Sequence, residues 1–77
     1  MTYNQFLQLD EAEQLEAIWA GEFIDQRLLN EYRISLYWLN GLYVEVYYNH
    51  IKNFIRKFEP LQTIDKEVAL IAYTNRN

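Results

Sequence analysis

The sequence predicts an α+β fold in which two N-terminal helices, an antiparallel meander of three to four strands and a C-terminal helix follow one another. Three observations predict it. Two helix-starting motifs occupy the first ten residues, Asn40-Gly41 separates two runs rich in β-branched and aromatic residues, and an amphipathic segment follows Pro60. Because 77 residues contain no linker or repeat, we expect a single domain over residues 1–77.

The two N-terminal helices are predicted from paired capping residues. Thr2 with Gln5, and Asp10 with Glu13, have the spacing of a capping box, in which each side chain bonds the backbone N–H of the other residue. Gly21 is a natural end for the second helix. The apolar residues expected to face the core from these helices are Phe6, Leu9, Leu15, Ile18 and Trp19.

Residues 22–30 leave two alternatives open. Their imperfect alternation of polar and apolar side chains favours a strand, with Ile24 and Leu28 on its core face and Asn30-Glu31 as the following turn. A continuation of the preceding helix through Leu29 is the competing interpretation. We prefer the strand.

Residues 32–49 read as two strands folded back at Asn40-Gly41, and the length of the loop decides their register. A two-residue loop pairs Trp38 with Tyr43 and mixes polar with apolar side chains on both faces. A three-residue loop that includes Leu39 pairs Trp38 with Leu42 and collects the apolar side chains on one face. Because a slip of one residue turns a whole strand over, we predict the three-residue loop, with Gly41 in the left-handed conformation.

The predicted register defines an inner and an outer face of the hairpin. Its inner face is apolar and adds Ile34, Leu36, Trp38, Leu42, Val44 and Val46 to the core. On the outer face Glu45 is expected to form a surface ion pair with Arg33. Tyrosines at neighbouring cross-strand positions make that face a candidate interaction surface, formed by Arg33, Tyr37, Tyr43, Glu45 and Tyr47.

The remaining third of the chain predicts a loop, a short strand and a helix. Residues 50–53 are expected to be the loop and residues 54–58 the fourth strand, which Pro60 ends because it has no N–H for a ladder. Residues 61–74 have helical periodicity. Their core-facing stripe is expected to be Leu61, Ile64, Val68 and Ile71.

Charge is unevenly distributed along the chain. The net charge is −4, and residues 1–31 carry −6 whereas residues 32–77 carry +2. An acidic protein repels nucleic acid and anionic membranes at long range, so neither partner is expected. A local basic cluster is nevertheless formed by Lys52, Arg56 and Lys57.

Catalytic and metal-binding motifs are not found. The chain has no cysteine, so disulfides and thiolate metal sites are excluded, and His50 is its single histidine. Glu45 could act as a general acid or base only with a partner in reach, and the expected neighbours are Arg33 and tyrosines. We therefore expect no cofactor and no enzymatic activity. Without a signal peptide or a long apolar run, a cytoplasmic protein is expected.

Several short pieces occur in an order that resembles a group of small bacterial proteins of unknown function. The pieces are Phe6-Leu7, Ile18-Trp19, Asn40-Gly41, residues 43–49, residues 55–58 and Pro60-Leu61, and together they cover most of the length. The loop at residues 50–53 is shorter than in that group. The resemblance implies no activity, cofactor or site residue.

The function expected from these features is a non-enzymatic protein-interaction module that presents the tyrosine-rich outer face to a second copy or to another protein. One alternative is a single-stranded nucleic-acid binder that uses the same face with Lys52, Arg56 and Lys57. Another is a small ligand-binding protein or enzyme that uses Glu45.

Overall fold

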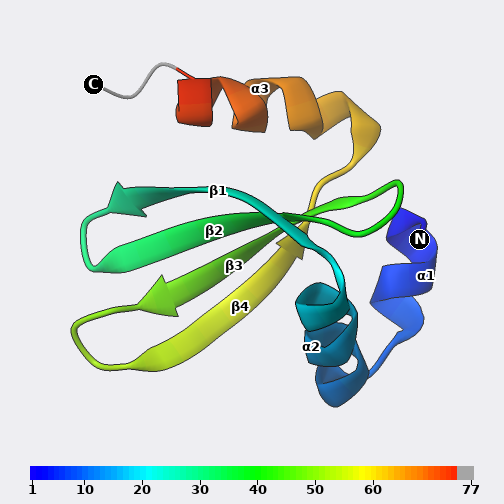
Figure 1. Cartoon of the computed structure of the whole chain (residues 1–77), viewed down its shortest axis with the longest axis horizontal. Helices are drawn as coiled ribbons and strands as arrows, with labels where there is room; N and C mark the ends of the chain where they lie inside the picture. The colour runs from blue at the N-terminus through cyan, green and yellow to red at the C-terminus, as the bar shows by residue number, and fades with distance from the viewer. Residues whose placement is uncertain (75–77) are drawn as a thin grey trace.

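A computed structural model describes residues 1–74, apart from the side chains of residues 63–66 and 74, and it has the predicted α+β fold (Figure 1). Residues 22–29 form a strand, so the helical alternative is wrong. The elements are α1 (Tyr3–Gln8), α2 (Glu11–Ala20), β1 (Glu22–Leu29), β2 (Tyr32–Trp38), β3 (Tyr43–Asn49), β4 (Phe54–Pro60) and α3 (Thr63–Thr74).

Both N-terminal helices begin at the predicted capping boxes. The Gln5 N–H donates to Thr2 Oγ1 over 3.1 Å, and the Glu13 N–H donates to Asp10 Oδ1 over 2.8 Å. The reciprocal bonds are also present. Gly21 ends α2 where β1 begins beside β2, and a Cβ atom there would lie 2.8 Å from the Trp38 carbonyl oxygen. Only glycine permits this close approach of helix end and strand.

The four strands form one antiparallel meander in the order β1-β2-β3-β4 (Figure 1). Each of the three reversals contains an asparagine with positive φ: Asn30 at 55°, Asn40 at 46° and Asn53 at 59°. Asparagine tolerates this left-handed region better than most residues because its short side chain bonds locally. Two irregularities bend the outer strands, since Ile24 of β1 and Arg56 of β4 have no partner in the strand pairing.

The predicted register of the central hairpin is wrong. Trp38 pairs with Tyr43 and Leu36 with Glu45, which is the register of the two-residue Asn40-Gly41 loop. Asn40 and Gly41 both have positive φ, as a type I′ turn requires, and the Leu39 N–H donates to the Leu42 carbonyl over 2.8 Å. This turn matches the right-handed twist of the strands. Its local preference therefore prevails over the sorting of apolar side chains to one face.

One face of the sheet packs against α1 and α2. Phe6 and Ile18 from these helices are fully buried in a cluster with the strand residues. We call this side face 1, and its buried residues are Leu39, Leu42, Val44 and Val46.

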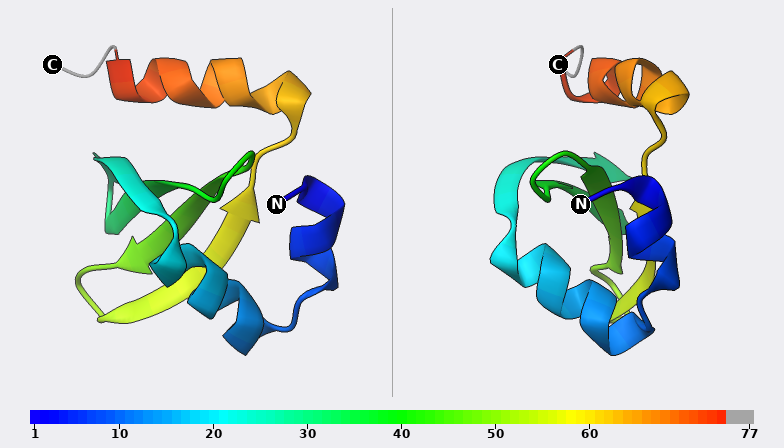
Figure 2. Two further views of the ribbon diagram at one scale, coloured as in Figure 1. Left: turned by 45° about the vertical axis from the view of Figure 1, so that its right-hand side comes forward. Right: turned by 90° about the vertical axis from the view of Figure 1, so that its right-hand side faces the viewer.

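The opposite face packs against α3, which lies across the sheet from α2 (Figure 2). We call it face 2; by the strand pairing it carries Ile34, Leu36, Tyr43, Glu45 and Tyr47. Ile34 and Leu36 are 0% and 1% exposed. Because helices pack against both faces, apolar side chains are buried on both, so the assumption that they all lie on one face selected the wrong register.

The predicted core is confirmed at Phe6, Ile18, Ile34, Leu36, Leu42, Val44 and Val46, whereas Leu9 and Leu15 are half-buried. It is wrong at six positions whose side chains are exposed: Trp19, Ile24, Leu28, Trp38, Val68 and Ile71. The α3 stripe fails because the helix turns Tyr73 toward the sheet and Val68 toward solvent, at 6% and 73% exposure. The predicted side-chain position of Ile64 lies outside the described residues.

Among residues 1–74, no helix is long and apolar enough to cross a membrane. The cytoplasmic location stays a prediction.

Candidate functional site

The register divides the predicted tyrosine-rich surface between the two faces of the sheet. Arg33 and Tyr37 lie on face 1, whereas Tyr43, Glu45 and Tyr47 lie on face 2. The five residues therefore do not form one interaction surface, which corrects the prediction. Aromatic side chains instead form separate groupings on the two faces.

Glu45 is the centre of a buried polar cluster rather than a surface residue. Its side chain accepts a hydrogen bond of 2.6 Å from the Tyr73 hydroxyl, and Arg27 Nη2 lies 3.4 Å from the same carboxylate oxygen. The Arg27 guanidinium also lies over the Tyr73 ring, 5.4 Å from its centroid. The predicted partner Arg33 is wrong, because it lies on the other face. We call Arg27, Glu45 and Tyr73 the polar cluster.

The polar cluster connects α3 to the sheet. Burial raises the pKa of the Tyr73 hydroxyl well above its usual value, and the hydrogen bond to the Glu45 carboxylate raises that pKa further. The hydroxyl is therefore a stable donor at neutral pH. The sequence offered no signal for this cluster, since 18 and 28 residues separate Glu45 from its two partners.

An open cleft of about 270 Å³ lies on face 1, beyond the part that α1 and α2 cover. Tyr37 lines it, and its ring is in edge contact with Trp19 and Phe23 at centroid distances of 5.8 and 5.7 Å. Burial raises the pKa of the Tyr37 hydroxyl. We call this cleft the aromatic groove; the lining residues that matter below are Trp19, Phe23, Arg33, Tyr37, Tyr48 and Ile55.

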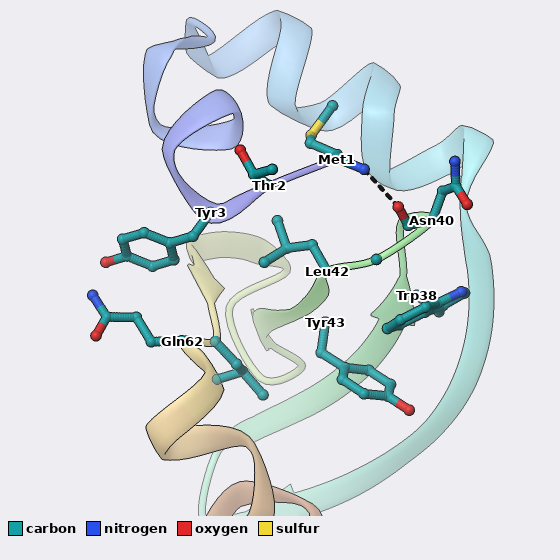
Figure 3. Close-up of a pocket in the computed structure, with 10 residues that line it drawn as sticks. Met1, Thr2, Tyr3, Trp38, Asn40, Leu42, Tyr43 and Gln62 are labelled. Atoms are coloured by element: carbon teal, nitrogen blue, oxygen red, sulfur yellow. Dashed lines mark hydrogen bonds between the residues drawn. The ribbon is translucent and has the colours of Figure 1, made fainter.

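A second cavity, of about 510 Å³, lies at the tip of the β2–β3 hairpin (Figure 3). Trp38 and Tyr43 pack against each other on one side of it, with ring centroids 4.7 Å apart, and Tyr3 and Gln62 lie across from them. The Met1 ammonium donates to the Asn40 carbonyl over 2.6 Å. The described residues that line this cavity have no charged side chain. The contacts tie the first residues of the chain to the hairpin.

The predicted basic cluster is only partly brought together. Arg56 Nη1 donates to the Tyr32 hydroxyl over 3.3 Å, and Lys57 Nζ lies 4.5 Å from the centroid of the Tyr47 ring. Lys52 is exposed in the β3–β4 turn. The sequence predicted the cations but missed Tyr32, which the revised register places near Tyr47 on face 2.

Other polar groups have local roles. The backbone N–H of His50 donates to the Glu31 carbonyl over 3.0 Å, and the buried Asn49 side chain accepts from the backbone of Ile51 and Lys52. In the described part of the chain no group of three or more histidine and acidic side chains could hold a metal ion.

Comparison with family models, curated proteins and solved structures finds no match to this chain. The resemblance to small bacterial proteins of unknown function stays a prediction.

Proposed function

We propose that this protein is a non-enzymatic interaction module that associates with a second copy of itself through the aromatic groove. The observation that carries the proposal is the exposure of four large apolar side chains on face 1 and the end of α2 that borders it. Trp19, Phe23, Leu28 and Ile55 are 58%, 52%, 69% and 39% exposed, respectively. Contiguous apolar surface of this kind marks interaction sites more often than scattered single residues do.

The apolar surface exposed at and beside the groove is large enough for a protein interface. Side chains of these types at these exposures leave about 400 Å² of apolar surface open to solvent, within the range of the largest patch on a typical monomer. A standard interface buries about 800 Å² on each partner, a little over half of it apolar. The exposed apolar area of these side chains is therefore close to the apolar share of one side of a standard interface.

Charge favours a second copy as the partner. Among the described residues that line the groove, Arg33 is the one with a charged side chain, whereas residues 1–31 carry a net charge of −6. Glu16 is exposed on α2, one helical turn before Trp19. In a two-fold dimer the same patch serves both copies, so each Arg33 can approach the acidic α2 of the other copy.

Sedimentation velocity over a wide concentration range tests the proposal. We expect the wild-type protein to shift from monomer to dimer. Leu28→Lys should remain monomeric because it places a charge on face 1 beside the groove, at the position paired with Arg33. Val68→Lys is the matched control, since Val68 is 73% exposed on the opposite side of the sheet. A wild-type monomer at every concentration, or a dimer lost in Val68→Lys and kept in Leu28→Lys, would contradict the proposal.

The buried state of Glu45 supports a non-enzymatic role. Its side chain is 3% exposed and already bonded to Tyr73 and Arg27. A general acid or base has to reach a substrate proton within hydrogen-bond distance. A carboxylate held in this way serves the attachment of α3.

A further inference from the structure

Three strands place aromatic rings together on the part of face 2 beside β4. Tyr32 of β2 is paired with Asn49, which is paired with Phe54 of β4, so the Tyr32 and Phe54 side chains share a face. Tyr47 of β3 lies on that face too, with its ring centroid 6.3 Å from that of Tyr32. Phe54 is 43% exposed. Three aromatic residues from adjacent strands thus share this face, and we call Tyr32, Tyr47 and Phe54 the row.

Two cations lie over this row. The Arg56 guanidinium is 5.9 Å from the centroid of the Tyr32 ring, and the Lys57 ammonium is 4.5 Å from that of Tyr47. Both residues are exposed. Arg56 is the unpaired residue of the β4 bulge, a position that frees its side chain from the regular alternation of the strand.

Cations gather beside the row although the whole chain is acidic. Lys57 has an exposed ion pair with Glu59 at 3.8 Å, a contact that contributes little and is readily exchanged. Arg56 has no such carboxylate partner among the described contacts, and Lys52 adds a further cation in the adjacent turn. The acidic side chains of residues 1–31 are on or next to α2 and β1. Among them, Glu11 of α2 lines a pocket together with Arg56 and Lys57, and Glu31 directly precedes Tyr32.

Rings and cations in this arrangement match the chemistry of an unpaired nucleic-acid strand. Aromatic side chains stack on bases of any sequence, and cations beside them hold the phosphates that connect those bases. Arg56 and Lys57 are on long flexible stems, so they can move from the ring faces to phosphates while bases occupy those faces. A duplex cannot use the rings, because its bases are already stacked on each other.

We propose that Tyr32, Tyr47, Phe54, Arg56 and Lys57 form a binding surface for single-stranded nucleic acid. The surface is distinct from the aromatic groove, which lies on face 1. With two or three phosphates contacted, binding is weak and depends on salt. It falls about tenfold between 50 and 200 mM salt.

Fluorescence anisotropy with a labelled mixed-sequence octanucleotide, DNA and RNA in turn, tests this surface. We expect saturable binding at low salt, weakened several-fold in Arg56→Gln and in Lys57→Gln together with a shallower salt dependence. Arg33→Gln is the matched control, because it removes the same charge from face 1. In Phe54→Leu, which keeps an apolar side chain, binding should weaken about fivefold or more with the salt dependence unchanged.

Three outcomes would overturn the proposal: no oligonucleotide binding at millimolar protein, equal affinity for the corresponding duplex, or equal losses of oligonucleotide affinity in Arg33→Gln and Lys57→Gln. The result is separable from self-association. The Leu28→Lys variant changes face 1 alone, so it should bind the oligonucleotide as the wild type does whether or not the protein dimerises.

Discussion

The two faces of the sheet are held by different kinds of interaction. Face 1 is covered by α1 and α2 through a continuous apolar cluster in which Phe6 and Val44 have no exposed surface. Face 2 packs against α3. Among the described side chains of this helix Tyr73 is the buried one, and its hydroxyl donates to Glu45. Apolar burial is non-directional and supplies most of the stability, whereas a hydrogen-bonded cluster has a defined geometry and supplies less. Face 1 thus carries the larger apolar cluster, whereas face 2 combines two buried apolar side chains, Ile34 and Leu36, with the hydrogen-bonded cluster that holds α3.

The largest effect is expected from the apolar side. Phe6→Ala removes a fully buried ring from the centre of the face 1 cluster, and we expect the free energy of unfolding to fall by about 3–5 kcal/mol. Urea denaturation followed by far-ultraviolet circular dichroism measures it. Leu7→Ala, at the neighbouring but 52% exposed position, is the control and should change little. A loss below 1 kcal/mol for Phe6→Ala would show that α1 does not contribute to the core.

An intermediate effect is expected from the polar cluster. Glu45→Ala leaves the Tyr73 hydroxyl without its acceptor and Arg27 without its carboxylate, and should cost about 2–3 kcal/mol in the same measurement. Glu59→Ala removes an exposed carboxylate from the same face and should stay within about 0.5 kcal/mol. Equal costs for the two variants would mean that the cluster is solvated.

The smallest effect is expected from the hydroxyl of Tyr73 and depends on pH. Burial and Glu45 raise the pKa of Tyr73 above the value of about 10 found in an unfolded chain. Its contribution is therefore complete below pH 10 and is lost as the pH rises toward the folded-state pKa, because the unfolded tyrosine ionises first. Tyr73→Phe should cost about 1 kcal/mol at pH 7 and reduce the loss of stability above pH 10.

Hydrogen exchange locates that last effect. In Tyr73→Phe the amides of α3 should exchange faster at pH 7. The exchange of the β2 and β3 amides should accelerate only as much as the loss of global stability predicts. Uniform acceleration throughout the protein would show that α3 does not open separately from the sheet.

The sequence was sufficient for the elements and insufficient for their orientation. Capping boxes, the Asn40-Gly41 turn and Pro60 act through neighbouring residues, so they predicted where helices and strands begin and end. The register required knowing that helices cover both faces, a property of the whole fold. The local signal at Asn40-Gly41 was correct, and the long-range assumption of a single apolar face was not.

The same limit applies to the candidate sites. Tyr37, Tyr43, Tyr47, Arg56 and Lys57 were selected as surface chemistry, yet which of them share a surface depends on the register. Strand pairing alone places Tyr32 and Phe54 on the same face as Tyr47. Trp19 lines the groove from a helix where periodicity predicted its burial. The link from Glu45 to Tyr73 spans 28 residues, from β3 through β4 to α3, and no local pattern encodes it.

The irregular outer strand β4 affects how readily this protein can aggregate. A meander ends in an edge whose backbone groups can recruit a foreign strand and grow into fibres. Here the bulge at Arg56 disturbs the spacing that such an addition needs, the adjacent Lys57 brings a charge, and Pro60 withholds a donor at the end. These features of β4 therefore disfavour the addition of a foreign strand to this edge. The side chains of Arg56 and Lys57 on the same strand remain exposed.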